Sequence, residues 1–294
     1  MERTWRPDGP LDVARTLAPH RRGTGDPTFR AGDGAIWRAS RTPDGPGSLC
    51  VKMRAGVVHA TGYGPGGQWL LDRLPDLLGG ADDGARFRPA HPFLRTAADA
   101  LRAVRLGRTA RVFEALVPAV LEQKVVGIEA RRAWRLLVRR FGDRAPGPHP
   151  DLFVPPAPAG WRRIPSWDWH RAGVEAVRAE TIIAAAAVAD RLEGQDPAET
   201  DRRLRSIRGI GVWTSAEVRQ RSHGDPDAVS VGDFHLARMV GWTLAGRIVD
   251  DDGMLRLLEP YAGDRFRATR LVELAGSRPP ARGPKVAARD YRRF

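Results

Sequence analysis

Alternating apolar and polar positions mark the first part of the chain. In the segment Leu49-Cys50-Val51-Lys52-Met53-Arg54, apolar residues recur at every second position, which is the period of a half-buried β-strand. Similar short segments cover residues 35–39 and 57–61, and turn-forming residues separate the three. We therefore predict an antiparallel sheet, preceded by a helix over residues 11–17 and closed by a helix around Trp69 to Leu78.

Helical periodicity dominates the chain beyond residue 95. Residues 80–95 are rich in Gly, Asp and Pro and predict a linker. The apolar-periodic segment from Phe113 to Phe141 predicts a long helix with a kink or break at Pro118, because an interior proline removes a helical hydrogen bond. A proline-rich loop follows over residues 142–160, and a further helix is expected from Arg178 to Leu192.

These patterns predict an α+β protein. We expect an N-terminal antiparallel sheet domain with helices over residues 1–80, then a linker and first helix over residues 81–104. An all-helical domain is expected over residues 105–277. The last segment, residues 278–294, is basic and lacks periodicity, so it is expected to be an extended, solvated tail.

The most informative stretch runs from Leu204 to Leu236. Gly209 and Gly211 flank one apolar residue between two helical segments, which predicts a tight hairpin whose backbone can approach a ligand closely. The helix that follows presents unpaired N–H groups at its start, a natural seat for a phosphate. Asp233 lies further on, in a turn of small residues. Its more ordinary interpretation is an N-cap of the next helix.

The composition of the chain restricts which partner and which cellular compartment are expected. The chain of 294 residues has a net charge of +13, which favours a polyanion such as nucleic acid. Only three of its 48 basic residues are lysines, and this arginine bias is also typical of a GC-rich genome, so charge alone does not decide the partner. One cysteine excludes a disulfide framework and a cysteine-ligated cluster. The N-terminus lacks a signal-peptide pattern and no apolar run would span a membrane, so we expect a cytoplasmic, nucleoid-associated protein.

Together these motifs resemble the helix-hairpin-helix (HhH-GPD) DNA glycosylases, in particular their 3-methyladenine DNA glycosylase II branch. The match rests on residues 204–216, the turn Pro226-Asp227-Ala228, Gly232-Asp233, and the segment from Phe113 to Gln123. It covers residues 105–275 on motifs and residues 1–80 on architecture alone. The resemblance implies an enzyme that acts on damaged double-stranded DNA with no required cofactor. The sequence carries no signal for an oligomer, so a monomer is the default expectation.

The resemblance also implies roles for individual residues. Asp233 becomes the catalytic carboxylate, and the backbone carbonyls of Ile207 and Ile210 become ligands of a possible Na⁺ or K⁺ ion at the hairpin. The remaining roles fall into two sets, DNA-binding residues (Gly209, Ile210, Gly211, Thr214, Gln123 and Lys124) and residues of the base pocket (Trp213, Glu217, Phe234 and Trp169).

Trp213 points to the type of reaction. Bifunctional relatives carry at this position a lysine that attacks the sugar, whereas this chain has tryptophan. Without the amine, a Schiff-base step is not expected. We therefore predict a monofunctional glycosylase that hydrolyses the N-glycosidic bond of a flipped-out alkylated base and leaves an abasic site.

Two departures from the branch leave the substrate open. Lys124 stands where the branch has an apolar residue that wedges into the duplex, and Glu217 stands where it has an aromatic residue. A glycosylase for a deaminated or oxidised base is therefore an alternative. A non-catalytic module that only binds damaged DNA is a second one. Trp213, Gln123 and Trp169 could also be ordinary packing residues.

Overall fold

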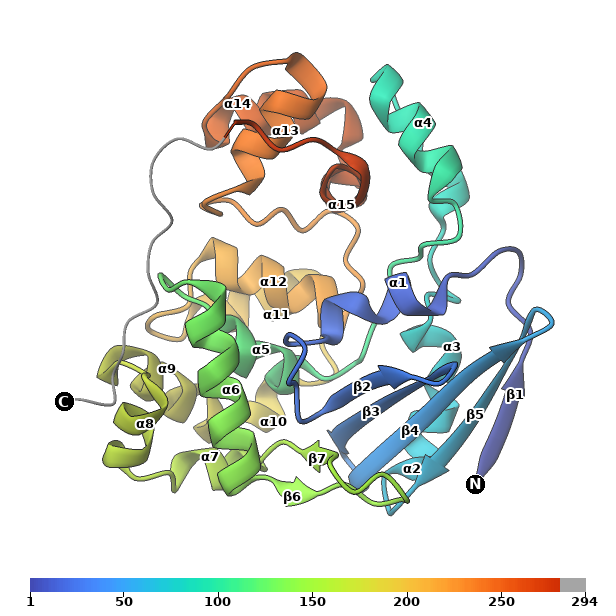
Figure 1. Ribbon diagram of the computed structural model, residues 1–294. Coiled ribbons are helices and arrows are strands. Elements are labelled where there is room, and N and C mark those ends of the chain that lie inside the picture. The colour runs from blue at the N-terminus through green and yellow to red at the C-terminus, as the bar shows by residue number, and fades with distance from the viewer. Residues whose placement is uncertain (281–294) are drawn as a thin grey trace.

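A five-stranded antiparallel sheet forms the N-terminal part of the computed structural model, which describes residues 1–280 (Figure 1). The strand order is β1-β5-β4-β3-β2, and in this register Cys50 lies opposite both Trp37 and Thr61. The strands are β1 (Glu2–Trp5), β2 (Phe29–Gly32), β3 (Ala35–Thr42), β4 (Gly45–Arg54) and β5 (Val57–Tyr63).

Short helices cover one face of this sheet. Asp12 caps the first of them by accepting the N–H of Arg15 at 2.9 Å, and leucines of the others pack on Leu49 and Val51. Cys50, on the opposite face of β4, is also buried, so β4 is covered on both sides at this point. The helices are α1 (Val13–Leu17), η1 (Ala18–His20), α2 (Gly67–Asp72) and α3 (Leu74–Leu77).

A first group of helices shares one apolar core that includes Val120, Trp161 and Ile210. It also contains a two-stranded hairpin in the proline-rich loop, whose second strand packs on the sheet. The predicted α+β class is confirmed, and the region expected to be all-helical is largely helical. The group consists of α5 (Val112–Leu121), α6 (Gly127–Phe141), β6 (Asp143–Arg144), β7 (Phe153–Val154), α7 (Pro158–Arg162), α8 (Ser166–Ala172), α9 (Ala176–Ala187), α10 (Ala189–Leu192), α11 (Pro197–Arg205) and α12 (Val212–Ser222).

A second group of helices has its own core, in which Leu94 packs with Val240 and Val272. In this group α4, which follows the linker, packs against the last helix of the chain, α15 (Figure 1). Asp233 therefore lies where the chain passes from the first group to the second. The second group consists of η2 (Gly84–Arg86), α4 (Pro92–Ala100), α13 (Leu236–Ala245), α14 (Asp251–Leu258), η3 (Glu259–Tyr261) and α15 (Arg265–Ala275).

The break in the predicted helix over residues 113–141 falls at Lys124 and not at Pro118. Pro118 is accommodated inside α5, whereas Lys124 adopts φ +54, which a right-handed helix cannot contain. The chain then restarts as α6 at Gly127. The loop between the two helices holds Gln123 and Lys124 next to each other.

Polar contacts join the sheet to the first group of helices. Glu114 of α5 accepts hydrogen bonds from the Ser40 hydroxyl at 2.7 Å and the Arg41 N–H at 2.9 Å, and pairs with Arg38. Asp26, fully buried, accepts the indole N–H of Trp134 at 3.0 Å. Across residues 1–280, no helix is long and apolar enough to cross a membrane. Most of the predicted basic tail, residues 281–294, lies outside the described residues.

Candidate DNA-binding and catalytic site

The predicted hairpin lies between α11 and α12. Gly209 has φ +90, and a Cβ atom there would lie 2.3 Å from the Thr181 hydroxyl oxygen. Gly211 differs, because its backbone is extended and a Cβ atom would meet no protein atom within 4 Å. The protein itself therefore requires a glycine at 209. At 211 the bare backbone leaves room for something outside the protein.

Gln123 braces the hairpin from the end of α5. Its side-chain amide donates to the Gly209 carbonyl at 2.9 Å and to the Thr214 hydroxyl at 2.8 Å. Thr214 is buried, and no side chain caps the start of α12. The first N–H groups of α12 are thus available to an acceptor outside the protein. Gln123 fixes where these N–H groups lie, because it is hydrogen-bonded to Gly209 and Thr214. Lys124 is exposed beside this brace.

Asp233 is held by three donors. One carboxylate oxygen accepts the backbone N–H groups of His235 at 2.8 Å and Leu236 at 2.9 Å, and the other accepts the Trp213 indole N–H at 3.2 Å. The carboxylate therefore does cap the start of α13, as the ordinary interpretation proposed. It is also tied to the first turn of α12, so the hairpin helix and the carboxylate keep a fixed relation.

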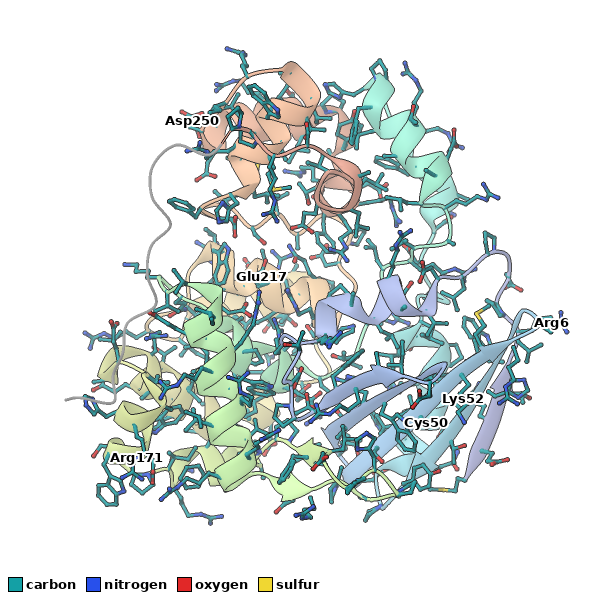
Figure 2. The ribbon with its side chains drawn as sticks, viewed as in Figure 1. Arg6, Cys50, Lys52, Arg171, Glu217 and Asp250 are labelled. Carbon is teal, nitrogen blue, oxygen red and sulfur yellow. The ribbon has the colours of Figure 1, made fainter. Side chains whose placement is uncertain are left out.

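Glu217, labelled in Figure 2, lies one helical turn beyond Trp213 and is engaged on both oxygens. It accepts the Ser230 hydroxyl at 2.6 Å and pairs with Arg221 at 2.8 Å. Burial lowers the pKa of Arg221, but the carboxylates of Glu217 and Glu122 outweigh burial and raise it. Because helical residues four apart share a face, Glu217 places a fixed ion pair on the same side of α12 as Trp213.

Glu273 of α15 extends this charged cluster. It pairs with Arg270 at 3.1 Å, and its side chain is 42% exposed. Partial desolvation, together with Glu217, raises the pKa of its carboxyl above the usual range against the opposing effect of Arg270. Arg22 and Glu122, 3.3 Å apart, continue the cluster toward the sheet domain. The polar network is therefore assembled from the sheet domain and from both groups of helices.

The other predicted site residues occupy different environments. Ile210 is buried, and its N–H donates to the Ile207 carbonyl at 3.1 Å, which retains a second lone pair. Phe234 is 81% exposed. Trp169 is 3% exposed in the core of the first group and stacks on Trp161 at 5.8 Å. Its burial in this core agrees with the packing role that the sequence left open for Trp169.

Sequence reasoning missed several residues that support the site. Ser230 orients Glu217, and the Thr181 hydroxyl of α9 lies between the Val177 carbonyl at 2.9 Å and the Arg208 carbonyl of the hairpin at 3.3 Å. Ser230 belongs to no sequence motif, because its role depends on tertiary contacts with Gln220 and Glu217. Arg221 had a usable signal, since it follows Glu217 at the helical spacing that favours an ion pair.

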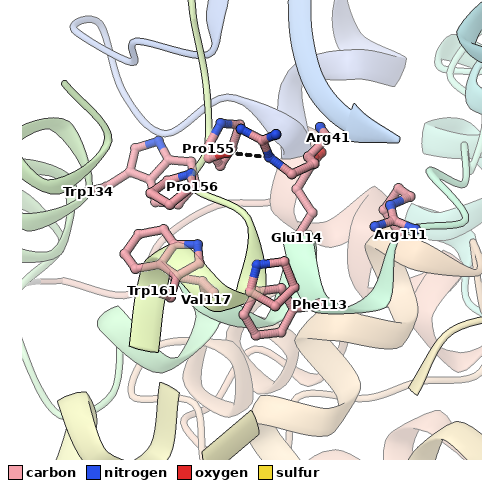
Figure 3. Close-up of a pocket in the computed structure, with 10 residues that line it drawn as sticks. Arg41, Arg111, Phe113, Glu114, Val117, Trp134, Pro155, Pro156 and Trp161 are labelled. Atoms are coloured by element: carbon pink, nitrogen blue, oxygen red, sulfur yellow. Dashed lines mark hydrogen bonds between the residues drawn. The ribbon is translucent and has the colours of Figure 1, made fainter. Parts of the chain in front are cut away.

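Two cavities elsewhere are poor candidates for a base site. The one drawn in Figure 3 lies among Trp134, Trp161 and Glu114 and has a volume of about 20 Å³, which is room for about one water molecule. A larger cavity of about 240 Å³ is lined by ion-paired residues, including Asp76 with Arg108 and Asp82 with Arg267. Neither Trp213 nor Asp233 lines either of them.

Several solved structures have similar folds and low sequence identity to this chain. A 3-methyladenine DNA glycosylase from Archaeoglobus fulgidus superposes with a TM-score of 0.79 at 18% identity, covering 92% of this chain and 97% of the other. The 8-oxoguanine glycosylase/lyase of Clostridium acetobutylicum gives 0.71 at 11% identity, with 92% and 95% covered. MBOgg1 bound to a low-affinity DNA ligand gives 0.73 at 15% identity, with 92% and 93% covered.

The chain has the fold of these DNA glycosylases. No family model and no curated protein matches the sequence. The glycosylase fold confirms the predicted resemblance at the level of architecture, including the N-terminal sheet domain. It does not separate the lesion classes, because the similar structures include glycosylases named for alkylated and for oxidised bases.

Proposed function

We propose that this protein is a monofunctional DNA glycosylase that removes alkylated bases from duplex DNA and leaves an abasic site. The carrying observation is the Asp233 carboxylate, which three hydrogen bonds hold beside the start of the hairpin helix. A fixed carboxylate stabilises the positive charge that develops on the sugar as the N-glycosidic bond breaks, and it orients the attacking water.

The hairpin supports DNA as the substrate. Gly211 leaves the start of α12 open, and unpaired N–H groups at a helix start bind phosphate. The net charge of +13 strengthens attraction to the backbone of DNA. A monomer suffices for this binding, and a monovalent cation on the carbonyls of Ile207 and Ile210 would add positive charge at the same place.

Hydrolysis without strand cleavage follows from the residue at 213. A lyase needs an amine that forms a Schiff base with the sugar, and Trp213 supplies only an indole N–H, which is directed at Asp233. An alkylated base that already carries positive charge leaves without a strong acid, which suits a site with one candidate catalytic carboxylate, Asp233. The indole face of Trp213 would add a cation–π contact of about 0.5–2 kcal/mol.

A second candidate function is removal of a neutral oxidised or deaminated base. The Glu217–Arg221–Ser230 network favours it, because this network offers fixed hydrogen-bonding groups where an aromatic wall would favour a cationic base. In this case the hydrogen-bonding edge of the base would select the substrate.

The test compares wild type with Asp233→Asn on duplexes that carry methylated, deaminated or oxidised bases. Asparagine keeps an acceptor for the cap of α13, so the variant is expected to fold and bind DNA while base release falls at least about 100-fold. Wild type should release free base without nicking the strand. Full activity of the variant would refute the mechanism, and borohydride-trappable strand cleavage by wild type would refute hydrolysis. Binding without release of any base would identify a damage-binding protein instead.

A further inference from the structure

Phe234 is the most exposed of the large apolar side chains in residues 1–280, at 81%. A phenylalanine side chain left in water forgoes the favourable free energy of burying its ring. Its ring contacts His235 edge-on, with centroids 4.9 Å apart. This exposed aromatic side chain lies directly beside the candidate catalytic residue, where it is accessible to a bound partner.

The segment that carries Phe234 is held on both sides. Asp233 accepts the N–H groups of His235 and Leu236 after it. Before it, Gly232 has φ +89 and donates its N–H to Asp251 at 3.1 Å. The hydrogen bonds that fix the carboxylate therefore also hold the phenylalanine ring outward.

Base removal from a duplex leaves a gap in the base stack. The target nucleotide must leave the stack, and DNA-bending proteins fill such openings with apolar wedges such as Phe, Leu or Met. The loop after α5 presents the exposed, charged Lys124 at its tip instead. A lysine ammonium group binds phosphate well, but a lysine side chain has no flat ring that could stack in place of a base.

Position favours Phe234 for this role. Asp233 must lie next to the sugar of the extruded nucleotide, and the Cα atom of the following residue is about 3.8 Å from its own. The strand that has lost its base from the stack thus passes within one side-chain length of Phe234. A flat aromatic ring there can stack on the bases beside the gap.

We propose that Phe234 inserts into the DNA duplex at the gap left by the extruded nucleotide, while Lys124 contacts the phosphate backbone. This inference rests on the proposed glycosylase function. It assigns Phe234 to the duplex and not to the wall of the base pocket.

The first test measures binding to a duplex that contains a tetrahydrofuran abasic-site analogue, against the intact duplex of the same sequence. Stacking on one base contributes about 1–3 kcal/mol, so wild type should prefer the gapped duplex by about tenfold or more. Phe234→Ala should lose this preference to within about twofold, and Phe234→Leu should retain much of it. Lys124→Ala should weaken binding to both duplexes alike, since it removes a phosphate contact.

The second test measures single-turnover base release from duplex and single-stranded substrates. Phe234→Ala should slow release from the duplex about tenfold or more, and leave single-stranded release within about threefold, because a single strand has no gap to fill. Trp167→Ala provides a matched control, since Trp167 of α8 is also an exposed aromatic, at 64%.

The outcomes separate this inference from the function on which it depends. If Phe234→Ala keeps the preference for the gapped duplex, or if Lys124→Ala alone abolishes it, the insertion role is overturned while base release by wild type still stands. If wild type releases no base from any substrate, the proposed function fails. The gapped-duplex measurement then still decides whether Phe234 inserts.

Discussion

At the scale of single residues, Asp233 caps a helix and is also the candidate catalytic carboxylate. Its two oxygens have different partners, because one caps α13 and the other accepts the Trp213 indole N–H. Capping alone needs only the first oxygen. The contact with Trp213 crosses from one group of helices to the other, and it fixes the direction in which the carboxylate points.

Trp213 is therefore expected to act as a positioning residue. Trp213→Phe keeps an aromatic ring but removes the N–H, and a hydrogen bond to a charged group contributes about 1.5–3 kcal/mol. We expect single-turnover base release to fall about tenfold, while binding to undamaged duplex changes less than about twofold. Single-turnover kinetics beside equilibrium binding measure the two effects. Trp167→Phe, at the exposed tryptophan of α8, should change neither, and an equal loss of rate and binding in Trp213→Phe would contradict the positioning role.

At the scale of elements, the two hairpin glycines serve different purposes. Gly209 is required by the fold, since its φ of +90 and the nearby Thr181 hydroxyl exclude a side chain. Gly211 is extended and faces open space. Internal packing thus explains the glycine at position 209, and room for the approach of a ligand explains the glycine at position 211.

Matched alanine variants separate these two reasons. Gly209→Ala should lower the free energy of unfolding by about 2 kcal/mol or more, from backbone strain and the contact with Thr181. Gly211→Ala should cost less than about 1 kcal/mol and still weaken DNA binding, because a methyl group would stand where phosphate approaches. Urea denaturation and a binding titration measure the two quantities. Normal DNA affinity in a stably folded Gly211→Ala would argue against phosphate binding at this hairpin.

At the scale of the whole molecule, the sheet domain and both groups of helices contribute to one polar junction. His20, at the end of η1, lies within it. Burial, followed by the cations of Arg38 on β3 and Arg221 on α12, with Arg22 and Arg270 of α15, lowers the pKa of His20 well below 6.5. His20 is thus neutral where three parts of the chain meet.

This junction predicts a pH dependence of stability. In the unfolded chain His20 becomes protonated near its ordinary pKa of about 6.5. In the folded protein the lowered pKa keeps His20 neutral at that pH. The free energy of unfolding should therefore decrease as pH falls below about 6.5, and this contribution should be constant above it. Urea denaturation at pH 7.5 and pH 5.5 measures the loss, which His20→Gln should reduce. His59→Gln, at an exposed position on β5, should leave it unchanged. An unaltered loss in His20→Gln would show that other groups cause it.

Much of the fold was predictable because it depends on local patterns. Alternation located β3, β4 and β5, and the helix expected over residues 11–17 is present as α1 with Asp12 as its N-cap. The missed strand β2 is short and pairs through its backbone. The helix break was predicted at Pro118, but α5 contains this proline and the break lies at Lys124. The left-handed conformation of Lys124 ends the helix where the Gln123 side chain can reach the hairpin.

By itself, the sequence determined the hairpin, the aspartate that follows it and the absence of a lysine at position 213, because each depends on residue identity at fixed spacing. Only the tertiary structure decided which side chains meet. It joined Trp213 to Asp233, engaged Glu217 with Ser230 and Arg221, buried Trp169, and left Phe234 in solvent. The physical reason is that burial and hydrogen-bond partners depend on contacts between segments that are distant in the chain, and local periodicity carries no information about them.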